Sequence, residues 1–245
     1  MCKKIVTIAA IVLAVSGLTL AGNTATITTT GSGNSASATQ SGDLNVATIE
    51  QVVDDSIAVV VQKVGSNNAK ILQSSGSDHT ANINQLTAGN DALIQQFGYY
   101  QVGTTTQDVG TGNIARMWQS GYGWNTATQL QQGSGNRAVI NEQRNPWGAT
   151  AGNTASQTQI LDNNKATLQQ KGQGNNAVQY QEGNNNWSGE GYGPLGIWQD
   201  GNNNYADIYQ FGNTNRASIS QTGDWHWSTI SQIGDGNIAT VVQGP

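Results

Sequence analysis

The sequence predicts an all-β fold of the solenoid class, built from stacked strand-turn-strand repeats. Three observations lead to this prediction: a composition rich in amides and poor in charge, a Gln that recurs about every 11 residues, and a period-two pattern before each Gln. The 245 residues include 27 Asn, 26 Gln and 31 Gly but only 3 Pro, and 10% are charged. This composition excludes collagen and argues against both an ordinary core-packed enzyme and a charge-rich disordered chain.

The N-terminus has the pattern of a secretory signal peptide. Lys3 and Lys4 precede an apolar run from Ile5 to about Leu20, and small residues follow near Ala21. We therefore expect residues 1–21 to be a signal peptide that is removed on secretion. The run is short for a membrane span, and no other apolar stretch approaches the ~20 residues that a span requires, so the mature chain is not expected to cross a membrane.

Removal of this segment changes the chemistry that the chain can offer. It takes away Cys2, the only cysteine, so neither disulfides nor thiolate metal sites are expected. The net charge moves from -5 to about -7, because two lysines leave 8 basic residues against 15 acidic ones. An acidic chain with scattered basic residues is a poor binder of nucleic acid.

The repeat is defined by a Gln that returns through nearly the whole chain. Of the 17 steps between successive positions, twelve are 11 residues, three are 12, and two are longer, at 17 and 18. Glu142 takes the place of Gln in one copy. The Gln positions are Gln40, Gln51, Gln62, Gln73, Gln85, Gln96, Gln107, Gln119, Gln131, Gln159, Gln170, Gln181, Gln199, Gln210, Gln221, Gln232 and Gln243.

Asn and Ala hold fixed places before this Gln, in the pattern G-x-x-N-x-A-x3-Q. Gly42, Asn45, Ala47 and Gln51 form one complete copy. His79 and His226 stand at the Asn position in two degenerate copies. The Asn positions are Asn34, Asn45, Asn67, Asn90, Asn113, Asn125, Asn136, Asn153, Asn164, Asn175, Asn204, Asn215 and Asn237.

Each copy is predicted to be a seven-residue strand. Four positions of each copy are spaced by two residues: Asn, Ala, the position two residues after Ala, and Gln. Alternate residues of a strand share one face, so these four side chains point the same way. The third of these four positions is often apolar, as at Ile49, Ile71 and Leu168. The residues between strands are rich in Gly, as in Gly201-Asn202-Asn203, and are predicted to be tight turns with positive φ.

Stacking explains why the inner face carries amides. A buried amide needs hydrogen-bond partners, and identical amides in strands stacked at ~4.8 Å can supply them to one another. Eighteen strands at two per turn give about nine rungs. We expect the Asn and Gln positions to form a self-assembly ladder, because repeats at both ends of the solenoid look ordinary and uncapped ends can dock head to tail.

The two long steps are predicted to be insertions into turns. They hold Arg144–Gly148 and Trp187–Gly193. If strands alternate between two sheets, the insertions protrude from opposite edges of the solenoid.

The pattern of Asn, Ala, Gln and Gly turns closely resembles the curlin repeats, which build curli fibres, the secreted functional amyloids of bacterial biofilms. The resemblance covers residues 31–243, after a short segment at 22–30 and before a tail at 244–245. It implies a β-solenoid subunit of a pilus-like or fimbrium-like fibre at the cell surface, acting in cell adhesion and biofilm matrix. It also implies self-association, a companion curlin subunit, and export through an outer-membrane pore with accessory proteins.

Two other functions are compatible with a solenoid. A monomeric surface-binding module, such as an adhesin or an ice-binding protein, is suggested by threonines on one predicted sheet, although Val59, Asn82 and Tyr205 interrupt that array. A carbohydrate-active β-helix would need clustered carboxylates, which the sequence lacks. No catalytic constellation, phosphate loop or calcium-binding repeat is present, so we expect no enzyme activity, cofactor or metal.

Two sets of side chains have both a structural and a functional interpretation. Lys70, Arg116, Arg137, Lys165 and Arg216 fall on alternate strands and so on one sheet; they either solvate that face or contact an anionic surface. His79 and His226 are expected to be buried neutral substitutes for Asn, with a pH sensor as the alternative.

Overall fold

The computed structural model describes residues 22–145, 151–189 and 196–245, and every regular element among them is a β-strand. The all-β prediction is therefore confirmed. The expected signal peptide at 1–21 lies outside the described residues. So do parts of both predicted insertions, Pro146–Gly148 and residues 190–193.

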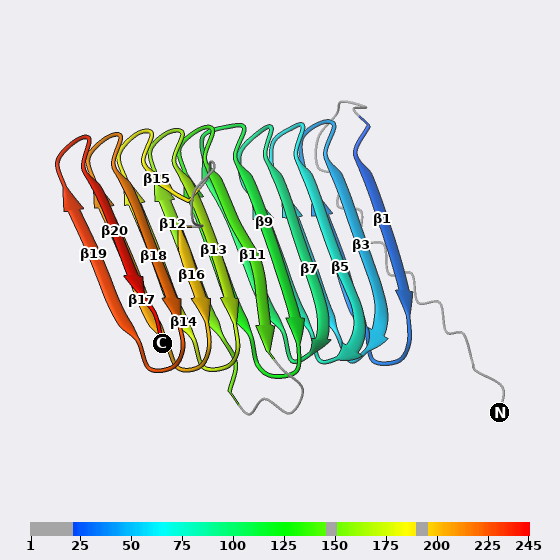
Figure 1. The fold of residues 1–245 in the computed structure, drawn as a ribbon. Coiled ribbons are helices and arrows are strands. Elements are labelled where there is room, and N and C mark those ends of the chain that lie inside the picture. The colour runs from blue at the N-terminus through cyan, green and yellow to red at the C-terminus, as the bar shows by residue number, and fades with distance from the viewer. Residues whose placement is uncertain (1–21, 146–150, 190–195) are drawn as a thin grey trace.

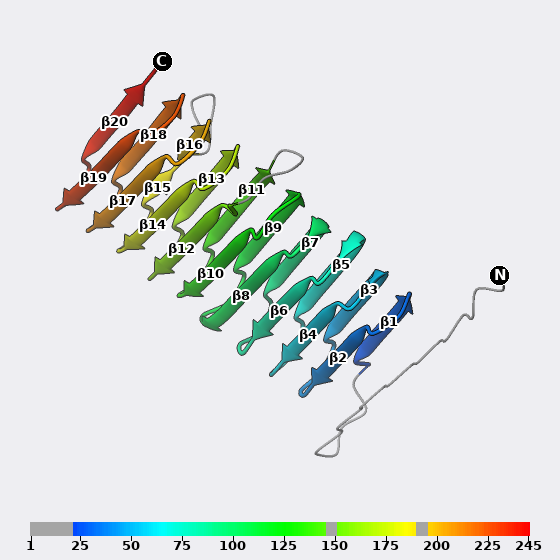
Figure 2. The same ribbon diagram turned by 90° about the horizontal axis from the view of Figure 1, so that it is seen from below.

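The strands form two parallel sheets that the chain visits alternately, as a β-solenoid does (Figures 1 and 2). Sheet A contains β1 (Thr24–Thr30), β3 (Val46–Asp54), β5 (Asn68–Ser77), β7 (Asp91–Tyr99), β9 (Ile114–Gly121), β11 (Arg137–Asn145), β13 (Lys165–Lys171), β15 (Trp187–Ser188), β16 (Ile197–Asp200), β18 (Arg216–Thr222) and β20 (Ile238–Gln243). Sheet B contains β2 (Ser35–Gln40), β4 (Ile57–Gln62), β6 (Thr80–Gln85), β8 (Val102–Val109), β10 (Thr126–Gln132), β12 (Thr154–Ile160), β14 (Asn176–Glu182), β17 (Tyr205–Phe211) and β19 (Trp227–Ile233).

The first strand of sheet A lies in the segment at 22–30 that the repeat pattern leaves out. Ala25 and Ile27 of β1 pair with Ala47 and Ile49 of β3, so they hold the same inner positions. Thr29 pairs with Gln51 and replaces the Gln by which the repeat is recognised. A search on Gln therefore misses this strand, although its Asn-x-Ala-x-Ile pattern is intact.

The second insertion interrupts a strand and does not lengthen a turn, so the predicted turn insertion at Trp187–Gly193 is wrong. Trp187 and Ser188 form β15, which pairs with the start of β13, and β16 pairs with the end of the same strand. Both segments also pair with β18. They share one level of sheet A, which makes ten levels from the eleven strands, against nine levels in sheet B. The second insertion is therefore not a turn between two strands, and where residues 146–148 and 190–193 protrude lies outside the described residues.

The place assigned to Glu142 also changes. The register between β11 and its neighbours shifts after Ile140, and Gln143 pairs with Gln119 on one side and Gln170 on the other. The extra residue is absorbed by a β-bulge, which places two residues opposite one and shifts the pairing by one position. Gln143, and not Glu142, holds the ladder register in β11.

The core is a narrow column of Ala and larger apolar side chains between the sheets. Ala47, Ile49, Ala69 and Ile71 are fully or almost fully buried, and the same positions are buried along the stack. Close packing is visible at Gly103, where an added Cβ would lie 2.7 Å from Met117 Sδ. The long Met117 side chain of sheet A fills the space that the missing Cβ of Gly103 leaves in sheet B. The larger residue thus compensates for the smaller one.

The turns confirm the predicted positive φ. Gly201 has φ 135° and Asn203 has φ 55°. Turns of successive rungs also approach closely, since a Cβ on Gly201 would lie 2.0 Å from Gly223 O. Gly is required there both for its conformation and for the short distance to the next rung.

Candidate self-assembly site

The Gln side chains form a hydrogen-bonded ladder along each edge of the core. Gln62 Nε2 donates to Gln85 Oε1 at 2.9 Å, and Gln85 Nε2 donates in turn to Gln107 Oε1 at 2.9 Å. The equivalent bonds between the other described ladder side chains measure between 2.8 and 3.0 Å. Amides that would be unfavourable if buried alone are thus satisfied by their neighbours.

The second N–H of each amide bonds across to the facing sheet. Gln73 Nε2 donates to Ile57 O at 3.0 Å, and Gln96 Nε2 donates to Thr80 O at 2.9 Å. Ile57 and Thr80 each begin a strand of sheet B. The Gln column therefore joins rung to rung and also fixes the spacing between the sheets.

The Asn positions use a different bond from the one expected of a simple amide ladder. Asn67 N donates to Asn45 Oδ1 at 3.1 Å, and Asn90 N donates to Asn67 Oδ1 at 3.0 Å. The side-chain Nδ2 donates to turn carbonyls, as from Asn45 to Ser41 O at 2.9 Å. Asn links the backbone of one rung to the next and ties down the turn, because its shorter side chain reaches the main chain and not the neighbouring amide.

The structure places the predicted ladder residues in these columns. All are buried except Asn34, Gln243 and Asn237, which lie on the terminal rungs. Asn23 and Asn186 belong to the same columns, and sequence reasoning missed both: Asn23 Oδ1 accepts from Asn45 N at 2.9 Å and Asn186 N donates to Asn164 Oδ1 at 2.9 Å.

Three successive rungs of sheet B show what happens when Asn is replaced. Ser56, His79 and Gln101 precede Asn125 in that column, and all four side chains are buried. His79 N donates to Ser56 Oγ at 3.1 Å, so the backbone link survives. Two side-chain atoms, His79 Nδ1 and Gln101 Oε1, are buried without a partner. Burial lowers the pKa of His79 below its ordinary value of 6.5, as expected for a neutral substitute.

A second Gln column runs through the centre of sheet B and was not predicted. Gln129 Nε2 donates to Gln157 Oε1 at 3.0 Å, and Gln157 Nε2 donates to Gln179 Oε1 at 2.7 Å. These residues occupy the inner position that is apolar in most other rungs, such as Ile83 and Ile208. The signal was available as Gln repeated two residues before the ladder Gln in three consecutive sheet B strands.

The bonds between ladder Gln side chains all point the same way along the stack, opposite to the Asn links. Each Nε2 donates to the rung nearer the C-terminus, so the first rungs present acceptors and the last rungs present donors. Gln40 Oε1 in β2 is buried and has no partner, and Gln51 Oε1 has none because Thr29 lies beneath it. The two ends of the solenoid are thus chemically different and complementary.

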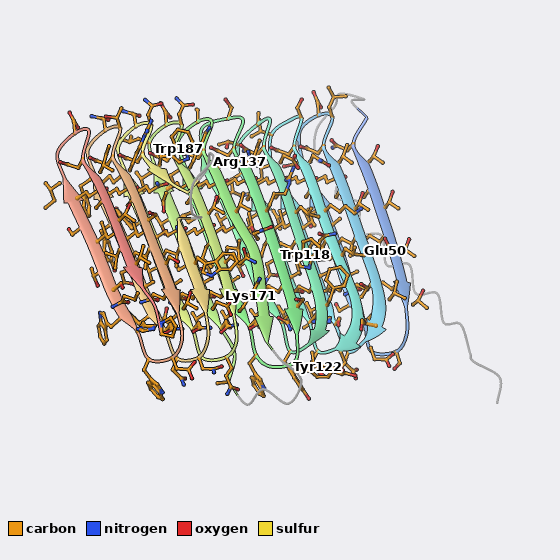
Figure 3. All side chains as sticks on the ribbon, viewed as in Figure 1. Glu50, Trp118, Tyr122, Arg137, Lys171 and Trp187 are labelled. Carbon is orange, nitrogen blue, oxygen red and sulfur yellow. The ribbon has the colours of Figure 1, made fainter. Side chains whose placement is uncertain are left out.

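The five predicted strand cations all lie on sheet A, as expected. Arg137, Lys165, Trp187 and Arg216 are neighbours in register on adjacent strands of sheet A. Figure 3 labels Arg137 and Trp187 in this row. Lys165 Nζ lies 5.0 Å and the Arg216 guanidinium 5.2 Å from the Trp187 ring centre, so the Trp sits between two cations. On β9, Arg116 forms an ion pair with Asp91.

Sheet B carries a different group on its outer face. Burial raises the pKa of Asp207, and a hydrogen bond to that carboxyl raises the pKa of Tyr205 to about 12. The Tyr205 ring lies 4.6 Å from the Trp227 ring on the next strand. Aromatic side chains thus lie on both faces of the solenoid, whereas the five strand cations lie on sheet A.

Within residues 22–145, 151–189 and 196–245, no group of three or more His, Cys, Asp or Glu side chains is arranged to hold a metal ion. The same residues contain no helix long and apolar enough to cross a membrane.

Comparison with known families supports the resemblance seen in the repeat. Residues 196–223 and 213–244 match the family model of the curlin associated repeat. The matched region holds β16 to β20, and its inner-face register continues through the earlier strands. No curated protein matches the chain.

Proposed function

We propose, from the curlin-associated repeats at residues 196–244 and the common register of the whole solenoid, that the chain is a structural subunit of an extracellular fibre. Copies add end to end, and each new copy extends both sheets and the stacked inner faces. The observation that carries this proposal is that the core and the ladders run open to both ends of the described solenoid.

Among the described residues, no polar segment covers the apolar column at the terminal rungs. Ala25, Ile27 and Ala36 at one end, and Ala239 and Val241 at the other, pack on the core but stay only partly buried. The edge strands beside them present backbone N–H and C=O groups that the next strand would pair. Addition of a copy therefore buries apolar surface and satisfies these groups in one step.

A curli-like role places the mature protein outside the cell, in adhesion and biofilm matrix. We extend the proposal accordingly to removal of residues 1–21, to export through an outer-membrane pore with accessory proteins, and to assembly with a companion curlin subunit. The curlin repeats and the solenoid fold point to a structural protein and not to an enzyme. A monomeric surface-binding role finds no support on sheet B, where Val59, Asn82, Tyr205 and Asp207 break the threonine array.

The test uses two lysine variants on the last strand. Val241 faces the core and Val242 faces outward, 72% exposed. Val241→Lys would bury a charge against the next copy, which is strongly unfavourable, whereas Val242→Lys keeps its charge in water.

The full chain is diluted from denaturant, and thioflavin fluorescence and electron microscopy follow fibre formation. We expect fibres from the unmodified chain and from Val242→Lys, and a loss or at least a tenfold slowing of growth for Val241→Lys. An unmodified chain that stays a soluble monomer for days would refute the proposal, as would equal growth of the two variants.

A further inference from the structure

The two sheets contain different numbers of levels. Sheet A has ten, because β15 and β16 share one, and sheet B has nine. The described solenoid therefore begins on sheet A with β1 and ends on sheet A with β20. Figure 2 shows the two rows of strands along the stack.

The two sheets together hold 19 levels, and this odd number restricts how a second copy can continue the stack. If the next copy keeps the same orientation, its β1 lies on β20, but its β2 then finds no strand directly beneath it, since β19 is two levels away. If the next copy turns by about 180° about the long axis, its β1 lies on β19 and its β2 lies on β20. Only the turned arrangement leaves no missing strand.

We propose that successive copies stack with this half turn, so that sheet A of one copy continues as sheet B of the next. The inference rests on the proposed end-to-end assembly and specifies its geometry. The partner is a second copy of this chain, and the contact surfaces are β19 and β20 of one copy and β1 and β2 of the other.

The ladder chemistry fits this junction. Gln243 Nε2 bonds Trp227 O at 3.2 Å and has a second N–H directed along the stack. In the turned arrangement this N–H meets Gln40 Oε1 of the next copy, the buried acceptor without a partner. The unturned arrangement places Thr29 over Gln243 and leaves the Gln40 acceptor unsatisfied, which is unfavourable for a buried group.

The turns fit as well. The turned arrangement lays Gly31-Ser32-Gly33-Asn34 of the next copy on Gly234-Asp235-Gly236-Asn237, so that Gly meets Gly and Asn meets Asn. Within the chain, Asn237 N donates to Asn215 Oδ1 at 2.9 Å, and the same bond from Asn34 N of the next copy would reach Asn237 Oδ1. In the unturned arrangement no complete turn among the described residues of the next copy lies on residues 234–237; only Asn23, which precedes β1, reaches that register.

The apolar column also continues. In register, Ile27 of the next copy lies on Ile230, and Ala36 and Ala38 lie on Ala239 and Val241. The less favourable contact is Thr29 on Gln232, where a hydroxyl replaces an amide, as it already does under Gln51 within the chain.

The half turn has a consequence for the fibre surface. The strand cations lie on sheet A alone, so they would appear on opposite sides of the fibre in successive copies. One level of either sheet is half a rung, and the ten levels of sheet A and nine of sheet B make nineteen half-rungs. At ~4.8 Å per rung, each copy lengthens the fibre by roughly 46 Å.

Disulfide cross-linking distinguishes the two arrangements. Same-face neighbours on adjacent parallel strands are about 4.8 Å apart, within the Cα separation that a disulfide accepts. Thr240 faces outward on β20. It would lie beside Ser37 of the next copy if the copies are turned, and beside Thr26 of the next copy if they are not.

Two full-chain variants are compared, each in a Cys2→Ser background: Ser37→Cys with Thr240→Cys, and Thr26→Cys with Thr240→Cys. Fibres are oxidised and separated under denaturing, non-reducing conditions. We expect a ladder of covalent oligomers from the Ser37 pair and at least tenfold less from the Thr26 pair. Residues 1–21 are the same in both variants and affect them alike.

The outcomes separate the two proposals. Fibres that cross-link through the Thr26 pair, through both pairs equally, or through neither would overturn the half turn and leave the proposed function standing. A Cys2→Ser chain that forms no fibres would overturn the proposed function, and the half turn with it.

Discussion

A Gln on the inner face makes the same set of bonds in nearly every rung. Gln96 is fully buried, accepts from Gln73, and donates to Gln119 and to Thr80 O. The neighbouring residue, Gln95, has the same side chain but points outward from the same strand. The contribution of a Gln side chain to stability therefore depends on the face of the strand from which it points. Gln96 and Gln95 provide a matched comparison of the two faces.

Gln96→Ala should lower the stability of the solenoid by about 2–5 kcal/mol, because it leaves a donor and an acceptor unpaired and opens a cavity. Gln95→Ala should change it by about 0.5 kcal/mol or less. The measurement is the guanidinium midpoint of fibre dissociation for both variants. Equal midpoints would contradict the role given to the inner ladder.

His79 makes stability depend on pH. Its Nε2 lies 3.1 Å from Ser75 O, a carbonyl that only accepts, so Nε2 carries the proton in the neutral ring and Nδ1 is left without a partner. Burial lowers its pKa in the folded state below the unfolded value near 6.5, although Asp78 opposes the shift. Protons therefore bind the unfolded chain more readily, and stability is lost as pH falls below about 6.5.

The expected result is a lower denaturant midpoint at pH 5 than at pH 8, with a smaller difference for His79→Asn, which restores the residue usual at this position. The midpoints of both chains are measured at the two values. If His79→Asn loses as much stability as the parent between pH 8 and pH 5, titration of His79 is not the cause.

At the scale of the element, strand position and inward face follow from the period-two pattern in most repeats. Four features did not follow, and one of them is the bulge that puts Gln143 in the ladder register of β11. β1 lacks the Gln that identifies a repeat, and β15 and β16 share a level that the sequence breaks with an insertion. The central column at Gln129, Gln157 and Gln179 was also missed, because the repeat pattern expects an apolar residue at that position and these amides are satisfied only by partners that the fold brings close.

The central Gln column should behave cooperatively. Each single change, such as Gln157→Ile, leaves Gln129 Nε2 and Gln179 Oε1 without their partner and should cost about 1–3 kcal/mol. Changing all three residues to Ile removes those partners together and restores the apolar side chain used in other rungs.

The triple variant should therefore lose less stability than the sum of the three single variants. Denaturant midpoints of the four variants and the parent give the comparison. Additive losses would show that the three amides act independently and not as a column.

At the scale of the whole molecule, the number of half-rungs sets the rotation between copies. Deletion of residues 212–222 removes one strand and turn, which makes the levels of the two sheets equal. Copies of that variant should stack with almost no rotation beyond the twist of the sheets. Deletion of residues 201–222 removes two strands, keeps the total odd, and should retain the half turn.

Electron cryomicroscopy of fibres from both deletion variants measures this rotation directly. The same rotation in the two variants would mean that strand parity does not determine how copies join. The comparison does not depend on any single contact, since both deletions rejoin the chain at Gly223.

End-to-end joining with a half turn carries one Gln ladder directly from copy to copy, from Gln243 to Gln40, while Thr29 takes the place of Gln in the other. A reconstruction of fibres of the unmodified chain by electron cryomicroscopy tests it most directly. We predict strands perpendicular to the fibre axis at a spacing of ~4.8 Å, with one Gln column continuous from Gln243 to Gln40 of the next copy. A gap in that column would contradict the half turn, and copies joined side by side through their sheet faces would contradict end-to-end assembly.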